Sequence, residues 1–189
     1  MSPILKNKNI SFVLVDPASP DAKEMVKSLE LDSENQKTTA LTYTIYALSP
    51  ARGDSAGQKR QCIVALDAKG KVVGAISFDA RVSDKNPTNE PLLRLRFLGS
   101  LLAKEGIGKT LIFLAALVAA SKNVGMFGEM DGNSTTFHQS LKAKVLTNSD
   151  IYGWDFAYYT PKKCEEFSAQ LSSIKFKSKV ISSPNEQVL

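Results

Sequence analysis

The alternation of apolar and polar stretches along the chain predicts a mixed α and β protein. Short runs of β-branched and aromatic residues that end in Pro, Gly or Asp are typical of strands. Such runs lie at residues 10–15, 62–66, 72–82, 92–98, 124–130 and 154–160. A capping residue predicts a helix at 20–31, and a second cap at 131–134 predicts one to about 144. Further helices are predicted at 38–48, 109–122 and 162–171. The order of these elements predicts an α+β fold.

One predicted strand and one predicted helix are joined by a turn with two glycines. The sequence Gly-Ile-Gly at 106–108 separates the strand at 92–98 from a helix that is apolar almost all round. The first N–H groups of a helix lack partners and carry partial positive charge, so they can hold an anion. Lys104 and Lys109 add full charges, and no acidic residue follows in the first turn. We interpret this segment as the phosphate-binding part of a nucleotide or coenzyme site, although an ordinary strand-to-helix turn has the same pattern.

Length and composition favour one globular domain. The chain has 189 residues, of which 43% are hydrophobic and 23% charged, and residues 182–189 are expected to form a frayed tail. The net charge of +5 is consistent with an anionic ligand and equally with simple solubility. No aromatic-basic repeat or recognition-helix pattern indicates a nucleic-acid-binding module.

The cysteines and the apolar stretches exclude some sites and compartments. Cys62 and Cys164 have neither the CxxC spacing nor the neighbouring histidines of a zinc site, so they are expected to be structural thiols, and no metal is expected. The N-terminal segment lacks the apolar core of a signal peptide, and the longest apolar stretch, at 111–120, is too short to span a bilayer. We therefore expect a cytoplasmic protein without a membrane partner.

The order of elements and the glycine turn together resemble the GNAT superfamily of N-acyltransferases, which bind acetyl-coenzyme A. In that family the fourth strand leads into a loop of pattern Arg/Gln-x-x-Gly-x-Gly/Ala, whose amides hold the coenzyme pyrophosphate. Residues 103–108 (AKEGIG) match both glycines, whereas Ala103 stands where the family usually has Arg or Gln. The resemblance implies an αβα layered fold with a mixed, mostly antiparallel sheet of six to seven strands, and acetyl-coenzyme A as co-substrate.

The same resemblance implies a proton-handling residue in the helix after the strand at 124–130. There the family often has a Tyr-x-x-Leu-Gly-Phe-like stretch, and its Tyr lies beside the coenzyme sulfur as a general acid. If Leu141 matches the family's Leu, His138 takes the Tyr position, whereas matching Asn133 to the family's capping Asn places Ser140 there. An imidazole can give or take a proton near neutral pH. The alternative is a histidine on the surface of an amphipathic helix.

Acetyl transfer also needs a base for the attacking amine. Glu129 and Asp131 end the strand next to the coenzyme strand, and the alternation of side chains would point both to one side. Asp79 is a further candidate. Tyr158 and Tyr159 on the last strand are candidates too, because one of such a pair usually packs in the core.

The thioester oxygen needs a hydrogen-bond donor, and a backbone N–H at a bulge near Leu98 or Gly99 would supply one. The predicted coenzyme-binding residues are therefore Leu98, Gly99, Ala103, Lys104, Gly106, Ile107, Gly108, Lys109 and Thr110. The predicted catalytic residues are His138, Glu129, Asp131 and Tyr159.

The sequence thus favours an N-acetyltransferase that acetylates a primary amine by direct transfer within a ternary complex. The acceptor stays open between a protein, an aminoacyl-tRNA and a small molecule, and a homodimer is an open alternative for the assembly. A GNAT-like module without catalysis, acting as a binding protein or inhibitor, is a second hypothesis because of Ala103. A P-loop nucleotide hydrolase is a third, because residues 103–110 also fit a relaxed Walker A pattern.

Overall fold

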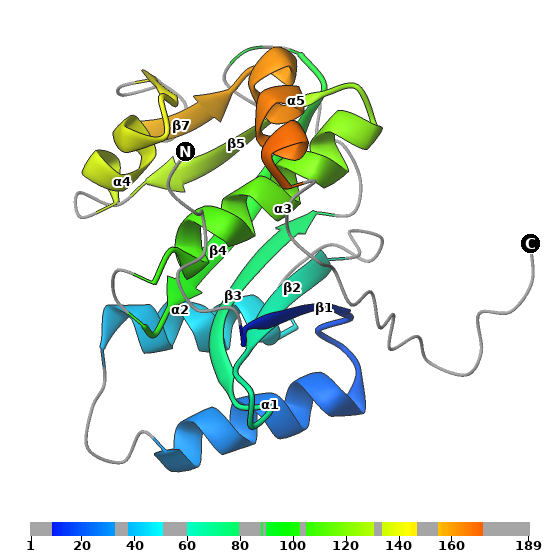
Figure 1. The fold of residues 1–189 in the computed structure, drawn as a ribbon, viewed down its shortest axis with the longest axis vertical. Helices are drawn as coiled ribbons and strands as arrows, with labels where there is room; N and C mark the ends of the chain where they lie inside the picture. The colour runs from blue at the N-terminus through cyan, green and yellow to red at the C-terminus, as the bar shows by residue number, and fades with distance from the viewer. Residues whose placement is uncertain are drawn as a thin grey trace, which may run out of the picture.

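A computed structural model describes residues 9–32, 38–50, 60–79, 88, 90–102, 105–130, 134–146 and 155–171. Its centre is a seven-stranded sheet with strand order β1-β2-β3-β4-β5-β7-β6 (Figure 1). The strands are β1 (Ser11–Val15), β2 (Arg60–Leu66), β3 (Val72–Asp79), β4 (Leu92–Ser100), β5 (Gly125–Met130), β6 (Lys144–Leu146) and β7 (Asp155–Tyr159). Within the described ranges, β4 and β5 pair in parallel and the other neighbours pair antiparallel. The predicted mixed, mostly antiparallel sheet is confirmed.

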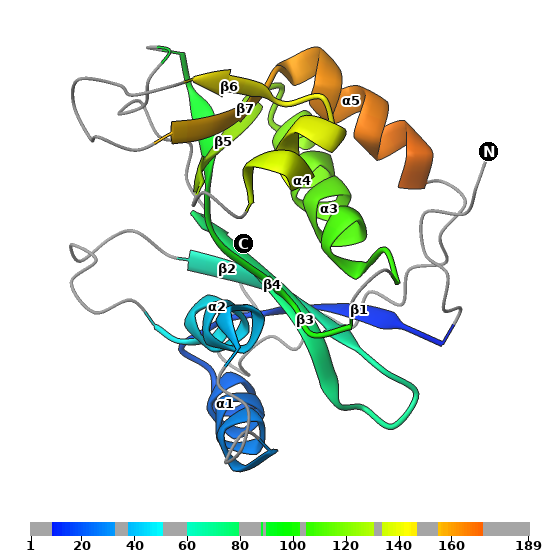
Figure 2. The ribbon, with the colours of Figure 1, turned by 90° about the vertical axis from the view of Figure 1, so that its left-hand side faces the viewer.

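Helices cover both faces of this sheet (Figure 2). The helices are α1 (Pro20–Asp32), α2 (Thr39–Leu48), α3 (Ile107–Ser121), α4 (Thr135–Ser140) and α5 (Pro161–Gln170). α1 and α2 lie on one face, and α3 lies on the other with α5 packed against it. The cap predicted at Ser19 is present, because Ser19 Oγ accepts from the Ala22 N–H at 3.2 Å. The start of α2 has a cap that was not predicted, since Thr38 Oγ1 accepts from the Leu41 N–H at 3.2 Å. Before α4 the N-cap residue is Ser134, whose side chain makes no capping hydrogen bond. The αβα layers are therefore those that the sequence predicts.

The apolar surface of α3 is explained by its position between the sheet and α5. Leu111 and Ala115 are fully buried in the core on this face of the sheet, together with Ile76 of β3. On the side of α5, Phe113 stacks on Phe167 with ring centroids 4.1 Å apart. Burial on both sides leaves little of this helix to solvent and fixes its first turn relative to β4.

The structure corrects two predicted helix boundaries. The helix expected to run to about 144 ends at Ser140, because Lys142 takes a φ of 59° in the left-handed region. The residues that follow form the short strand β6, which pairs with β7 and which the sequence pattern did not predict. The helix expected from 109 begins two residues earlier, at Ile107.

Two further predictions are resolved by the fold. A P-loop hydrolase needs a parallel sheet around its phosphate loop, so the antiparallel pairing of β3 with β4 excludes that alternative. In the part of the chain that the structure describes, no helix is long and apolar enough to cross a membrane. The expected tail at 182–189 lies outside the described residues.

Candidate active site

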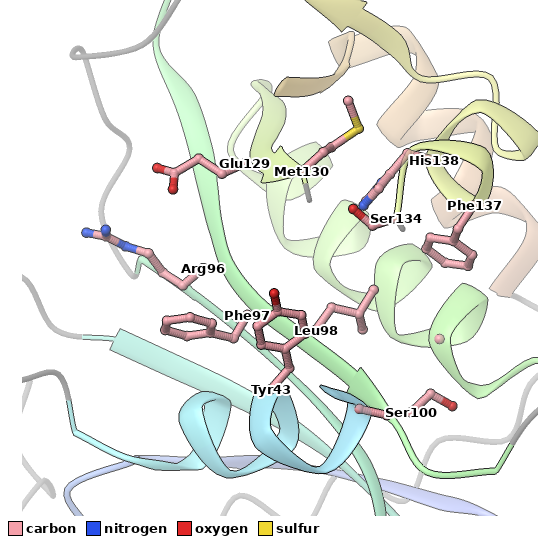
Figure 3. Close-up of a pocket in the computed structure, with 12 residues that line it drawn as sticks. Tyr43, Arg96, Phe97, Leu98, Ser100, Glu129, Met130, Ser134, Phe137 and His138 are labelled. Carbon is pink, nitrogen blue, oxygen red and sulfur yellow. The ribbon is translucent and has the colours of Figure 1, made fainter. Parts of the chain in front are cut away.

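The strands β4 and β5 separate part-way along their length and open a cleft. They pair from Leu92 with Gly125 to Leu95 with Gly128, and no further pair follows among the described residues. Beyond this point lies a cleft of about 570 Å³, a volume typical of small-molecule sites. Figure 3 shows Tyr43 and Leu98 on one side of this cleft, and Met130 and His138 on the other.

The separation begins at a bulge in β4. Ser77 of β3 pairs with Phe97, whereas the next residue, Phe78, pairs with Leu95, so Arg96 is an extra residue in β4. A bulge bends its strand and increases the local twist. The predicted bulge at Leu98 or Gly99 is therefore wrong in position, because the irregularity lies at Arg96.

Five elements supply the walls of the cleft. α2 and β4 contribute the side that bears Tyr43 and Leu98, and β5 and α4 contribute the side that bears Met130 and His138, while α3 contributes Gly108. The lining residues are Ala40, Tyr43, Arg96, Phe97, Leu98, Ser100, Gly108, Glu129, Met130, Ser134, Phe137 and His138. Of the predicted site residues, Leu98, Gly108, Glu129 and His138 thus meet in one cleft.

The start of α3 borders this cleft at Gly108, and its first amides have no side-chain cap among the described residues. Its N-cap Gly106 has a φ of 81°, no side chain caps the helix, and the first turn has no acidic residue. No described residue accepts a hydrogen bond from the N–H groups of Ile107, Gly108 or Lys109. The Thr110 N–H and hydroxyl both donate to Gly106 O, at 2.9 and 3.0 Å. Within the described part of the chain, the amides of residues 107–109 therefore lack an acceptor, whereas the Thr110 amide has one.

Other described residues that were predicted to bind the coenzyme do not line the cleft and instead pack within the fold or along α3. The Ile107 side chain is buried in the core, and Lys109 Nζ lies 5.4 Å from the centre of the Phe113 ring, along α3. A Cβ at Gly99 would lie 2.2 Å from Thr44 Oγ1, so this glycine allows α2 to approach β4. Ala103 and Lys104 lie outside the described residues.

Two predicted catalytic residues form a buried pair. His138 Nδ1 lies 2.6 Å from Tyr159 Oη, and the two residues are 7% and 1% exposed. Burial raises the pKa of Tyr159 above its usual value, and the nearby Cys164 raises it further, so the phenol stays protonated. Phe137 packs edge-on against the imidazole with centroids 5.2 Å apart. His138 thus enters the cleft with Tyr159 behind it.

The carboxylates are distributed unequally between cleft and core. Glu129 lines the cleft with its side chain 44% exposed and pairs with Arg94 Nη2. Asp79 is buried and accepts from Arg96 Nε at 2.8 Å, while its Oδ2 has no hydrogen-bond partner among the described residues. Asp79 does not line the cleft. Asp131 lies outside the described residues.

The remaining candidate side chains lie elsewhere. The Tyr158 hydroxyl donates to Glu90 Oε2 at 3.1 Å, outside the cleft. Burial raises the pKa of the Cys62 thiol and raises that of Cys164 to about 12, so both stay protonated. Both thiols are free and buried, as the sequence predicts for structural cysteines.

Comparison with known proteins identifies the fold. No family model matches the sequence, and no curated protein matches it. A mutant of the toxin AtaT, bound to the C-terminus of the antitoxin AtaR and to acetyl-CoA, superposes with a TM-score of 0.53 at 15% identity, covering 85% of this chain and 98% of that chain. A GNAT acetyltransferase from Staphylococcus aureus Mu50 gives 0.51 at 13% identity, covering 80% and 99%. The KacTA–DNA complex gives 0.50 at 16% identity, covering 83% and 96%. The chain has the GNAT fold.

Lys142, which follows α4, has a left-handed backbone conformation that can be compared with the family's sequence pattern. In the family's Tyr-x-x-Leu-Gly-Phe-like stretch a glycine follows the Leu, and glycine is the residue that favours positive φ. Lys142 follows Leu141 and has a φ of 59°. Lys142 thus adopts the conformation that the match on Leu141 would require of the glycine position, and the assignment of His138 or Ser140 to the Tyr position stays a prediction.

Several residues that line the cleft were not predicted from the sequence. Tyr43, Phe97 and Phe137 line it, yet nothing in their local pattern distinguishes them from ordinary amphipathic positions. Met130 lies between Glu129 and Asp131, and the sequence gives it no signal of its own. These residues reach one cleft through the packing of α2 and α4 on the separated strands, which no local sequence signal reports.

Proposed function

We propose that this protein is an N-acetyltransferase that transfers the acetyl group of acetyl-coenzyme A to a primary amine. One observation carries the proposal: the uncapped start of α3 borders the cleft between the separated strands β4 and β5. Three N–H groups that converge at a helix start, with no acid beside them in the first turn, suit a diphosphate. The GNAT fold and the acetyl-CoA bound to AtaT support this choice of ligand.

The cleft suits the rest of the coenzyme. Its side nearest α3 begins at Gly108, whose missing side chain leaves the first amides accessible. From there, Leu98 on β4 and Met130 on β5 offer apolar surface to the pantetheine arm. His138 and Glu129 also line this cleft, so the groups that handle protons lie in the same cavity as the proposed phosphate site.

The proposed reaction is a direct transfer. The amine nitrogen attacks the thioester carbon, so a C–N bond forms while the C–S bond breaks and the sulfur keeps the electron pair. The nitrogen loses one proton and the sulfur gains one. Glu129 is the one described carboxylate that lines the cleft, and we assign it to the amine side. His138, at the position of the family's Tyr, is assigned to the sulfur.

Calorimetry combined with an assay of free thiol separates this proposal from the hypothesis of an inactive binding module. Acetyl-coenzyme A and Mg-ATP are titrated separately into the protein, and free thiol is then followed in the presence of lysine peptides, polyamines and aminoacyl-tRNA. We expect acetyl-coenzyme A to bind, Mg-ATP not to bind, and coenzyme release to depend on one acceptor class. Binding without transfer to any acceptor would favour the inactive module, which Ala103 suggests. Absence of acetyl-coenzyme A binding would contradict the proposal.

A further inference from the structure

We infer that Tyr159 fixes the tautomer of His138, so that His138 serves the thioester as a hydrogen-bond donor through Nε2 and is not the base for the amine. The inference rests on the proposed function for its chemistry. Its structural part, the tautomer, is independent of that function. Tyr159 is accordingly a positioning residue, and His138 is the residue that touches the reacting atoms.

The hydroxyl of Tyr159 is buried and needs an acceptor for its proton. Tyr159 is 1% exposed, and His138 Nδ1, 2.6 Å away, is the acceptor that the described residues offer to its hydroxyl. A buried hydroxyl without an acceptor destabilises a fold. Because burial raises the pKa of Tyr159, the phenol keeps its proton and needs this acceptor. The Tyr159 O–H therefore donates to His138 Nδ1.

The tautomer then follows from the chemistry of imidazole. A neutral imidazole has one N–H and one nitrogen lone pair. With the Nδ1 lone pair bonded to Tyr159, the proton of the neutral ring is on Nε2. The ring of Phe137 packs at 75° to the imidazole, with centroids 5.2 Å apart, and the ring of Tyr159 lies 6.0 Å away centroid to centroid. Packing and the hydrogen bond together hold the ring in one orientation.

The tautomer determines what His138 can do in the proposed reaction. A neutral His138 in this tautomer has no lone pair left for the amine proton. Its Nε2–H can instead stabilise the negative charge that develops on the sulfur as the C–S bond breaks. The Nε2–H bond stays intact in this step. The proton that completes the thiol then comes from water, and the amine proton leaves through Glu129 or water.

The sole histidine of the chain makes the tautomer directly measurable. Protein labelled with ¹⁵N-histidine, without a polyhistidine tag and without coenzyme, gives a two-bond ¹H–¹⁵N spectrum of one imidazole only. We expect the Nε2–H tautomer in the wild type and a mixture of tautomers in Tyr159→Phe. Tyr158→Phe, on the same strand with its hydroxyl on Glu90, is the matched control and keeps the wild-type spectrum. An Nδ1–H tautomer in the wild type overturns the inference, even if Tyr159→Phe does not fold.

Kinetics test the role. We expect Tyr159→Phe to lower kcat about tenfold while KM for acetyl-coenzyme A changes less than about twofold, because one oriented hydrogen bond is lost. The Gln amide can donate near the position of Nε2 but cannot relay a proton. His138→Gln should therefore keep about tenfold more activity than His138→Ala. Equal losses in these two variants would overturn the donor role. If no acetyl transfer occurs at all, the proposed function fails, while the spectra still decide the tautomer.

Discussion

Replacing Gly108 with Glu tests the proposed phosphate site with little risk to the fold. A Cβ at this position would lie 3.7 Å from Phe137 Cζ and 3.8 Å from Ser100 Cβ, which is ordinary van der Waals contact. Gly106 is a poorer choice, because its φ of 81° strains any other residue. Gly108→Gln has nearly the same size without the charge and is the matched control. The pair of variants therefore separates charge from bulk.

The expected magnitude follows from the position of the carboxylate. In the first turn of α3 it gains about 0.5 kcal/mol from the helix dipole in the free protein. It also faces the proposed diphosphate at roughly 5 Å, where two unit charges repel by about 3 kcal/mol at an effective dielectric constant of about 20. Screening by water in the open cleft reduces this, so we expect a net loss of about 2 kcal/mol, or about 30-fold in Kd. Gly108→Gln should lose about threefold or less.

Isothermal titration of acetyl-coenzyme A measures both variants at low and at high salt. We expect the difference between Glu and Gln to shrink as salt rises, because the added term is electrostatic. Circular dichroism checks that both variants keep the wild-type fold. Equal Kd values for Glu and Gln at low salt would refute the idea that residues 107–109 hold a phosphate group.

Three further predictions concern stability, each measured by urea unfolding. Gly99→Ala should lower the free energy of unfolding by about 3 kcal/mol, because the new Cβ would lie 2.2 Å from Thr44 Oγ1 and 2.5 Å from Ala40 O. A loss near zero would mean that α2 is not held against β4. Asp79→Asn should cost about 3 kcal/mol by removing the buried carboxylate that Arg96 Nε faces, and an unchanged midpoint would contradict that. Because the pKa of Cys164 is raised to about 12 from an ordinary 9.0, its contribution to stability is complete below pH 9 and is lost as pH rises toward 12. Cys164→Ala should therefore weaken the fall in stability between pH 8 and 10 by about 1 kcal/mol, and an unchanged slope would argue against this.

The parts of the site that depend on local sequence could be predicted. The uncapped start of α3 is one such part. A Gly-Ile-Gly turn without a capping side chain or an acid in the first turn leaves the first helix amides without a side-chain partner in any fold. His138 and Tyr159 were each predicted separately. Their contact was not, because it depends on how α4 packs beside β7, 21 residues along the chain.

The features that were missed depend on pairing partners. The bulge at Arg96 exists only relative to β3, so the alternation within the strand at 92–98 could not show it. The strand β6 was missed because it has only three residues, the first of which, Lys144, fell in the predicted helix, and because Lys142 gives no glycine signal for the left-handed turn before it. Gly99 was interpreted as a bulge residue, although its role is to let Thr44 of α2 come close.

The parallel pairing of β4 with β5 has a consequence for how such a site can vary. Two parallel neighbours need a crossover connection, and here α3 is that connection. The N-terminus of α3 and the C-terminal ends of β4 and β5 must then lie at the same edge of the sheet. The uncapped start of α3, the separation of β4 from β5 and the segment that bears His138 are thus brought together by the connectivity of the chain. Residues remote from that edge can differ without disrupting the arrangement, which accords with a fold shared with AtaT at 15% identity.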